Sequence, residues 1–275
     1  MNFPRSFFVN FTTRVFAVAA SLALLAACGN DGNTADSSAG AASSGVALNG
    51  AGATFPYPIY NKWFSDYATL TGVKINYQSI GSGGGIRQLS EGTVDFGASD
   101  SPMKDEEIAG AKGPVMHIPT VVGAVVIAYN LPQVTQPLKL TGDVIAGVYQ
   151  GQITKWNDPR IATLNSGVAL PASDILAVYR SDGSGTTYIF SDYLATVNPQ
   201  WASAPGRGKE LQWPVGIGAK GNEGVAGQVK QTPNSIGYME LAYVKQNRLQ
   251  YAHVPNAEGQ FVDPTVASIT AAAEG

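Results

Sequence analysis

The 275-residue chain has one cysteine, Cys28, and only two histidines. One cysteine excludes an internal disulfide and any cysteine-rich metal site. His117 and His253 stand in apolar or strand-like surroundings, which favours structural roles for both. Asp105-Glu106-Glu107 is most simply the acidic first turn of a helix. We therefore predict that the protein uses no metal and no cofactor.

Charge is also scarce, because charged residues make up 13% of the chain and the formal net charge is −3 at pH 7. No basic stripe is visible, so nothing indicates nucleic-acid binding. An acidic protein that binds an anion must do so through local hydrogen-bond donors and not through its overall field. The chain also shows no internal repeat.

The N-terminus resembles an export signal. Arg5 and Arg14 make it basic, and the apolar run 15–27 is too short to span a bilayer comfortably. Leu25-Ala26-Ala27-Cys28 has the pattern of a bacterial lipobox, which implies cleavage before Cys28 and lipid attachment to its sulfur. We expect a signal peptide at 1–27 and a flexible tether at 28–45, with the folded part starting near Val46.

The first helix is predicted from aromatic spacing. After Pro56, Tyr60, Trp63, Phe64 and Tyr67 fall at i, i+3, i+4 and i+7, the stripe of an amphipathic helix. The helix should end before the glycine at position 72. We expect these aromatic side chains to lie in the core.

Further segments alternate between strand and helix patterns. Expected strands lie at 46–48, 73–78, 94–98, 121–129 and 175–179. Expected helices begin near Ile86 and Ser101-Pro102 and cover 142–149, 186–196 and 222–230. Such alternation favours an α/β fold with a largely parallel sheet, whose ligands lie at the carboxyl ends of strands.

Three Gly/Ser/Thr-rich segments, 50–56, 81–85 and 180–186, each open one of these expected helices. A helix start carries free N–H groups and a partial positive charge, and glycine lets the backbone approach a ligand closely. Three such segments, the last beginning with Arg180, indicate a small oxyanion held from several sides.

Two other motifs point elsewhere. Residues 216–221 match G-x-G-x-x-G, with Glu240 at the distance of a ribose contact, but only the apolar stub 213–215 precedes them. A loop opening the next helix is the favoured interpretation. Ser184 could be a hydrolase nucleophile, although positions 182 and 186 lack the glycines of the nucleophile elbow.

The motifs GAGATFP (50–56), IGSGGG (80–85), VDFGASD (94–100) and RSDGSGT (180–186) resemble the phosphate-binding proteins of bacterial phosphate ABC transporters. The likeness runs over nearly all of 46–270. It implies a two-lobed periplasmic-binding-protein (type II) fold, with 46–128 plus 252–275 as lobe 1 and 129–251 as lobe 2. Members continue beyond the point where this chain stops, so lobe 1 is expected to be incomplete and to expose apolar surface.

The resemblance also implies the ligand contacts. Asp182 would orient Arg180, and Asp100 would accept the proton that phosphate keeps near neutral pH and sulfate lacks. From this sequence alone, an equally good interpretation of Asp100 is a helix cap before Pro102. The implied phosphate-binding residues are Thr54, Phe55, Ser82, Asp100, Arg180, Ser184, Gly185 and Thr186.

The function implied is that of a monomeric, exported lipoprotein of the periplasm or cell surface. It would bind inorganic phosphate between its lobes and deliver it to the permease subunits of a phosphate ABC transporter, without being an enzyme. Two alternatives stay open: a lipid-anchored hydrolase of phosphate esters that uses Ser184, and the same fold binding another oxyanion such as sulfate or molybdate.

Overall fold

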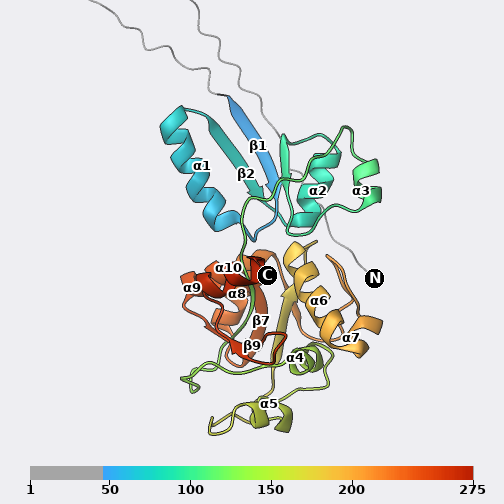
Figure 1. Cartoon of the computed structure of the whole chain (residues 1–275). Coiled ribbons are helices and arrows are strands. Elements are labelled where there is room, and N and C mark those ends of the chain that lie inside the picture. Colours follow the sequence, from blue (N-terminus) through green and yellow to red (C-terminus); the bar gives the residue numbers. More distant parts are fainter. Residues whose placement is uncertain (1–45, 275) are drawn as a thin grey trace, which may run out of the picture. The chain divides into compact units, whose positions relative to one another are not determined.

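The computed structural model describes residues 46–274, which form two α/β lobes, each built on its own sheet (Figure 1). The expected signal peptide, Cys28 and the tether lie outside the described residues. The α/β, two-lobed fold class predicted from the sequence is confirmed.

The first lobe contains a three-stranded parallel sheet in the order β2-β1-β3. Its strands are β1 (Ala47–Gly52), β2 (Lys74–Ser79) and β3 (Phe96–Ala98). In the register, Gly52 lies opposite Ser79 on one side and Ala98 on the other. The carboxyl ends of all three strands therefore meet at one edge of the sheet, as the sequence predicts.

Helix α1 (Tyr57–Thr71) has the predicted limits. Pro56 precedes it, and Gly72 ends it in the left-handed conformation with φ 76°. Tyr60 is buried and forms a cluster with Phe64, Tyr77 and Phe96. Trp63 and Tyr67 are 43% and 47% exposed, so the prediction that all four aromatics lie in the core is wrong for these two. A stripe this wide extends past the sheet beside the helix.

Helices α2 (Ser82–Ser90) and α3 (Asp105–Ala109) complete the first lobe. Helix α2 crosses the sheet so closely that a Cβ on Gly85 would lie 2.5 Å from the Cα of Gly52. The predicted helix start at Ser101-Pro102 is wrong. Helix α3 begins three residues later, where the Glu107 carboxylate accepts the backbone N–H of Lys104 at 2.8 Å.

The second lobe contains a five-stranded mixed sheet in the order β6-β5-β7-β4-β8. Strands β6 (Ile217–Ala219), β5 (Leu176–Arg180) and β7 (Ser235–Glu240) run parallel, whereas β4 (Val125–Tyr129) and β8 (Gln250–Tyr251) pair antiparallel. Strands β7 and β4 are buried along almost their whole length, which explains the continuous apolar composition of β4.

Helices cover both faces of this sheet. Its larger core surrounds Tyr238, whose ring stacks on Phe190 with centroids 4.1 Å apart. Burying aromatic pairs of this kind contributes about 1 kcal/mol each beyond area alone. The helices are α4 (Gly142–Tyr149), α5 (Pro159–Leu164), α6 (Gly185–Val197), α7 (Pro199–Ser203), α8 (Gly221–Gln231) and α9 (Leu241–Asn247).

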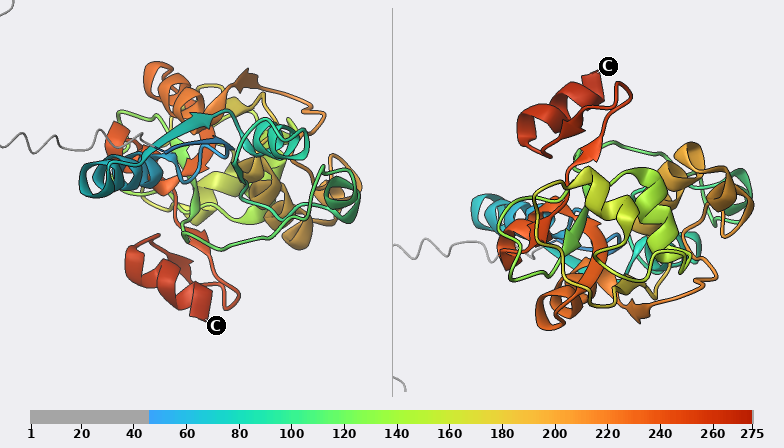
Figure 2. Two further views of the ribbon diagram at one scale, coloured as in Figure 1. Left: turned by 90° about the horizontal axis from the view of Figure 1, so that it is seen from above. Right: turned by 90° about the horizontal axis from the view of Figure 1, so that it is seen from below.

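Two boundaries differ from the expected division into lobes. Strand β4 pairs with β7 over its full length and with β8 over its last two residues, so 125–128 belong to the second sheet and not to lobe 1. The end of the chain forms β9 (Val254–Pro255), β10 (Phe261–Val262) and α10 (Val266–Glu274). Figure 2 shows α10 at the periphery, and its Ile269 packs against the second-lobe core instead of lobe 1.

Large apolar side chains are exposed mainly in the first lobe. In the part of the chain that the structure describes, no helix is long and apolar enough to cross a membrane. The exposed first-lobe residues are Val46, Leu48, Tyr57, Ile59, Trp63, Tyr67, Leu70, Met116, Ile118 and Val122.

Candidate oxyanion-binding site

The three glycine-rich segments meet where the two lobes touch. The backbone N–H of Gly83, in the first turn of α2, donates to the carbonyl of Gly183 at 2.9 Å. A Cβ on Gly83 would lie 3.2 Å from the Cα of Gly183, so glycine at both positions permits the approach. The N-termini of α2 and α6 are thereby brought to one place, which concentrates free N–H groups there.

Ser82 joins the lobes through its hydroxyl. The Ser82 Oγ accepts the backbone N–H of Asp100 at 3.2 Å and that of Gly185 at 3.1 Å. A hydroxyl oxygen has two lone pairs and one hydrogen. Because both lone pairs are occupied, Ser82 can only donate its hydrogen to a ligand.

Arg180, at the end of β5, is the buried cation of the site, with 4% of its surface exposed. Its guanidinium forms a two-pronged pair with Asp182, at 2.8 Å from Nε and 2.6 Å from Nη2. Burial raises the pKa of Asp182, but hydrogen bonds from Arg180 and Gly221 outweigh burial and leave that pKa below its usual value. Asp182 thus stays ionised and holds the guanidinium in one orientation, as predicted.

Thr186 connects Arg180 to Asp100. The Thr186 hydroxyl donates to Asp100 Oδ2 at 3.2 Å and accepts from Arg180 Nη1 at 3.4 Å. Burial raises the pKa of Asp100 to about 6, although Arg180 and Thr186 act in the opposite direction. Asp100 does not cap a helix, since α3 starts at Asp105. Its position favours the ligand-facing interpretation over the cap.

Sequence reasoning missed Asn222, in the first turn of α8. Asn222 is fully buried and donates to the Thr54 hydroxyl twice, from its backbone N at 3.1 Å and from Nδ2 at 2.6 Å. The Thr54 carbonyl accepts from the hydroxyl of Tyr243 at 2.6 Å. The available signal is a fourth glycine-rich helix start, 216–221, which the sequence analysis interprets as a loop opening a helix without assigning it to the anion site.

A dinucleotide-binding motif requires a strand before its first glycine, but here the strand lies within the motif 216–221. Strand β6 covers three of its six residues and pairs with β5, and α8 starts at the last glycine. A dinucleotide fingerprint places its glycines after the strand, so this arrangement does not fit one. The interpretation as a loop that opens α8 is closer, with β6 as the part it missed.

The remaining predicted contacts lie at the same place. Ser184 is buried and caps α6, because its Oγ accepts the N–H of Thr187 at 3.0 Å. Within residues 46–274 its hydroxyl donates no hydrogen bond, which leaves its hydrogen free for a ligand. The backbone N–H of Phe55 makes no hydrogen bond within residues 46–274. All eight predicted ligand residues and Asp182 therefore lie around the lobe contact.

Glu240, at the end of β7, is a second buried carboxyl of this region. Its Oε2 accepts the N–H of Ala242 at 2.6 Å and caps α9. Burial raises the pKa of Glu240 to about 7, and the charge of Asp100 adds to the shift. Two carboxyls with raised pKa values in one region are typical of a functional site, and we expect ligand binding there to depend on pH near neutrality.

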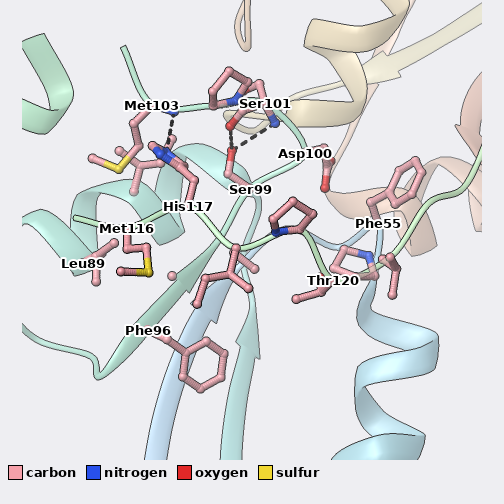
Figure 3. Close-up of a pocket in the computed structure, with 18 of the residues that line it drawn as sticks. Phe55, Leu89, Phe96, Ser99, Asp100, Ser101, Met103, Met116, His117 and Thr120 are labelled. Carbon is pink, nitrogen blue, oxygen red and sulfur yellow. Dashed lines mark hydrogen bonds between the residues drawn. The ribbon is translucent and has the colours of Figure 1, made fainter. Parts of the chain in front are cut away.

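A cavity of about 850 Å³ lies beside this site in the first lobe (Figure 3). Phe55 and Asp100 are at its edge, and its walls are mostly apolar. His117 lies in the wall and accepts the N–H of Met103 at 3.2 Å, a structural bond. Residues 46–274 hold no cluster of side chains suited to a metal ion.

Two α/β lobes that meet at a row of buried hydrogen-bond donors define a two-lobed ligand-binding protein. A family profile described as "PBP superfamily domain" matches residues 36–274. The phosphate-binding protein PstS of Pasteurella multocida is 52% identical over 227 residues, which cover 82% of this chain and 65% of that protein. The PstS of Haemophilus influenzae is 49% identical over 227 residues, which cover 82% of this chain and 67% of that protein.

The structure of PfluDING, a periplasmic phosphate-binding protein solved with phosphate, is similar in fold. The TM-score is 0.64 at 23% sequence identity, covering 82% of this chain and 67% of that one. The chain belongs to the PBP superfamily and, within it, to the family of PstS phosphate-binding proteins. It spans about two thirds of the length of the curated relatives, at 65%, 66% and 62% for three of them.

Gly185 offers a direct test of how tightly the lobes meet. A Cβ there would lie 2.6 Å from both the Cβ of Asp100 and the Oγ of Ser82. We expect Gly185→Ala to weaken anion binding by roughly 100-fold, since the lobes could not reach the same separation. Titration calorimetry with phosphate measures it. Gly227→Ala, where a Cβ meets nothing within 4 Å, is the control and should bind normally.

Proposed function

We propose that this protein binds inorganic phosphate between its two lobes and delivers it to the permease subunits of a phosphate ABC transporter, without chemical turnover. The observation that carries the proposal is the joint placement of Ser82 and Asp100 from the first lobe with Arg180 and Gly185 from the second. Family membership supports it, because the curated relatives are named phosphate-binding proteins.

The composition of the site favours phosphate over sulfate. Hydroxyls, backbone N–H groups and one guanidinium are all donors, which suits a tetrahedral oxyanion. Asp100 is the exception, because a carboxylate beside an anion is repulsive unless the anion carries a proton. Phosphate near neutral pH carries one and sulfate carries none, so Asp100 favours phosphate by accepting that proton.

The location belongs to the same proposal. Export by the leader 1–27, lipid attachment at Cys28 and a tether at 28–45 would place a monomeric receptor at the outer side of a membrane. Replacing Cys28 with Ser is expected to release the protein into the aqueous phase of a detergent partition, whereas the unchanged chain follows the detergent.

Titration calorimetry of the chain with phosphate tests the function, with sulfate as the matched anion. We expect saturable heat with phosphate and none with sulfate at pH 8. Sulfate binding as tight as phosphate binding would support the other-oxyanion alternative. A chromogenic phosphate ester tests the hydrolase alternative, and turnover that disappears in Ser184→Ala would contradict the proposal. No heat with either anion from folded protein would also contradict it.

A further inference from the structure

The hydrogen bonds of Asn222 fix which way two hydroxyls point. Thr54 Oγ1 accepts two N–H groups from Asn222, from the backbone N at 3.1 Å and from Nδ2 at 2.6 Å. Both lone pairs of this hydroxyl are then occupied, so its hydrogen must be donated away from Asn222. That hydrogen is therefore available to an oxygen acceptor on the side of Thr54 that faces away from Asn222.

The bonds to Thr54 reach the first lobe, and the same side chain also binds a hydroxyl of its own lobe. Asn222 Nδ2 also donates to Thr186 Oγ1 at 3.1 Å, and that hydroxyl in turn donates to Asp100. Asn222 Oδ1 accepts the backbone N–H of Glu240 at 2.9 Å. This last bond fixes the amide orientation, because a flipped amide would set its N–H₂ against the N–H of Glu240. Every hydrogen-bonding group of the buried side chain is therefore used.

We propose that Asn222 is a positioning residue of the oxyanion site, which turns the hydroxyls of Thr54 and Thr186 into fixed donors when the lobes close. The inference rests on the proposed function, since it needs an oxyanion ligand. The alternative hypothesis is that Asn222 only stabilises the first turn of α8. The two hypotheses predict different phosphate affinities when the donors of residue 222 are replaced by acceptors.

Asn222→Asp reverses the polarity with almost no change in shape. The introduced carboxylate would accept hydrogens from Thr54 and Thr186, turning the first away from the ligand and the second away from Asp100, and would add a negative charge. We expect phosphate affinity to fall by roughly 100-fold at pH 8. Lowering the pH protonates the introduced carboxyl and restores a donor, so the ratio of wild-type to variant affinity should shrink towards pH 5. Repulsion between the added charge and phosphate has the same pH dependence, so Asn222→Ala, which adds no charge, is measured beside it. A role confined to the first turn of α8 would leave the phosphate affinity of Asn222→Ala unchanged.

The ratio isolates position 222 because the other charged groups are common to both proteins. Asp100 lies across the lobe contact, Arg180 and Asp182 follow β5, Glu240 ends β7, and Glu223 is the neighbour on α8. Phosphate itself also titrates identically in the two measurements. Calorimetric titrations with inorganic phosphate at pH 5, 6, 7 and 8 provide the profile.

Asn165→Asp is the matched control. Asn165 is 6% exposed, donates through Nδ2 to the carbonyls of Lys139 and Ile161, and accepts through Oδ1. It touches none of the predicted ligand residues. We expect this variant to lower the melting temperature and to bind phosphate as the wild type does.

The outcomes separate the two hypotheses. If the wild type does not bind phosphate, the proposed function fails. If the wild type binds and folded Asn222→Asp binds within threefold of it at pH 8, the positioning role is overturned. Should Asn222→Asp not fold, Asn222→Ala decides the question: about tenfold weaker binding supports the proposal, and unchanged binding overturns it.

Discussion

Replacing Arg180 with Met is expected to weaken phosphate binding by roughly 1,000-fold or more. Arg180 is the buried cation of the site, and its charge-assisted bonds in a water-poor setting are among the strongest available to an anion. Removing it also leaves Asp182 and Asp100 without their positive partner, and losing one member of a buried pair costs about 3–5 kcal/mol. Calorimetry with phosphate, alongside a thermal melt, measures both effects.

The chain supplies a close control for this experiment. Arg160 forms the same two-pronged pair with the aspartate two residues earlier, Asp158, but its side chain is 51% exposed. Arg160→Met should change phosphate affinity by less than twofold, because exposed ion pairs contribute little. Arg180→Lys keeps the charge without the planar fork and should lie between, at roughly 10- to 100-fold weaker. A loss below tenfold in folded Arg180→Met would refute the assignment.

Asp100→Asn is expected to remove most of the discrimination between phosphate and sulfate. The amide repels sulfate less than a carboxylate does, so sulfate affinity should rise while phosphate loses its acceptor. We expect the affinity ratio to fall by roughly 100-fold at pH 8. Because burial raises the pKa of Asp100 to about 6, the wild type should itself discriminate less well at pH 5. Unchanged discrimination would remove Asp100 from this role.

The same substitution should stabilise the ligand-free protein. The folded state holds the Asp100 proton more tightly than the unfolded chain, whose aspartate pKa is 3.8. Stability therefore falls as the pH rises from about 4 to about 6 and stays low above that. Asp100→Asn avoids this loss, and we expect a gain of about 2 kcal/mol at pH 8 and little at pH 4. The exposed Asp174, paired with Lys155, supplies the control Asp174→Asn, which should change nothing measurable.

Local chemistry explains what could be predicted for the first lobe. Pro56 and the glycine at position 72 mark the ends of α1 in the sequence itself, and the structure has those ends. The side of the helix that stays exposed could not be read in the same way. Tyr60 and Trp63 belong to one apolar stripe, yet only Tyr60 meets the sheet, because burial depends on what packs opposite.

The pairing partner of a strand could not be predicted from the sequence either. The apolar run at 121–129 indicates a buried strand, but nothing within it says which sheet it joins. The antiparallel pairing of β4 with β7 decides that, and β7 lies about 110 residues further along the chain. Assignment of 125–128 to lobe 1 was wrong for this reason.

The sequence by itself determined the kind of site. Glycines, hydroxyls and Arg180 at helix starts predict an oxyanion site because their donors depend on residue type and local backbone alone. Only the tertiary structure decided how those donors are oriented. The contact between Thr54 and Asn222 joins residues 168 positions apart, and their spacing in the chain carries no trace of it. Hydrogen-bond direction at a buried site is set by which groups the fold brings together.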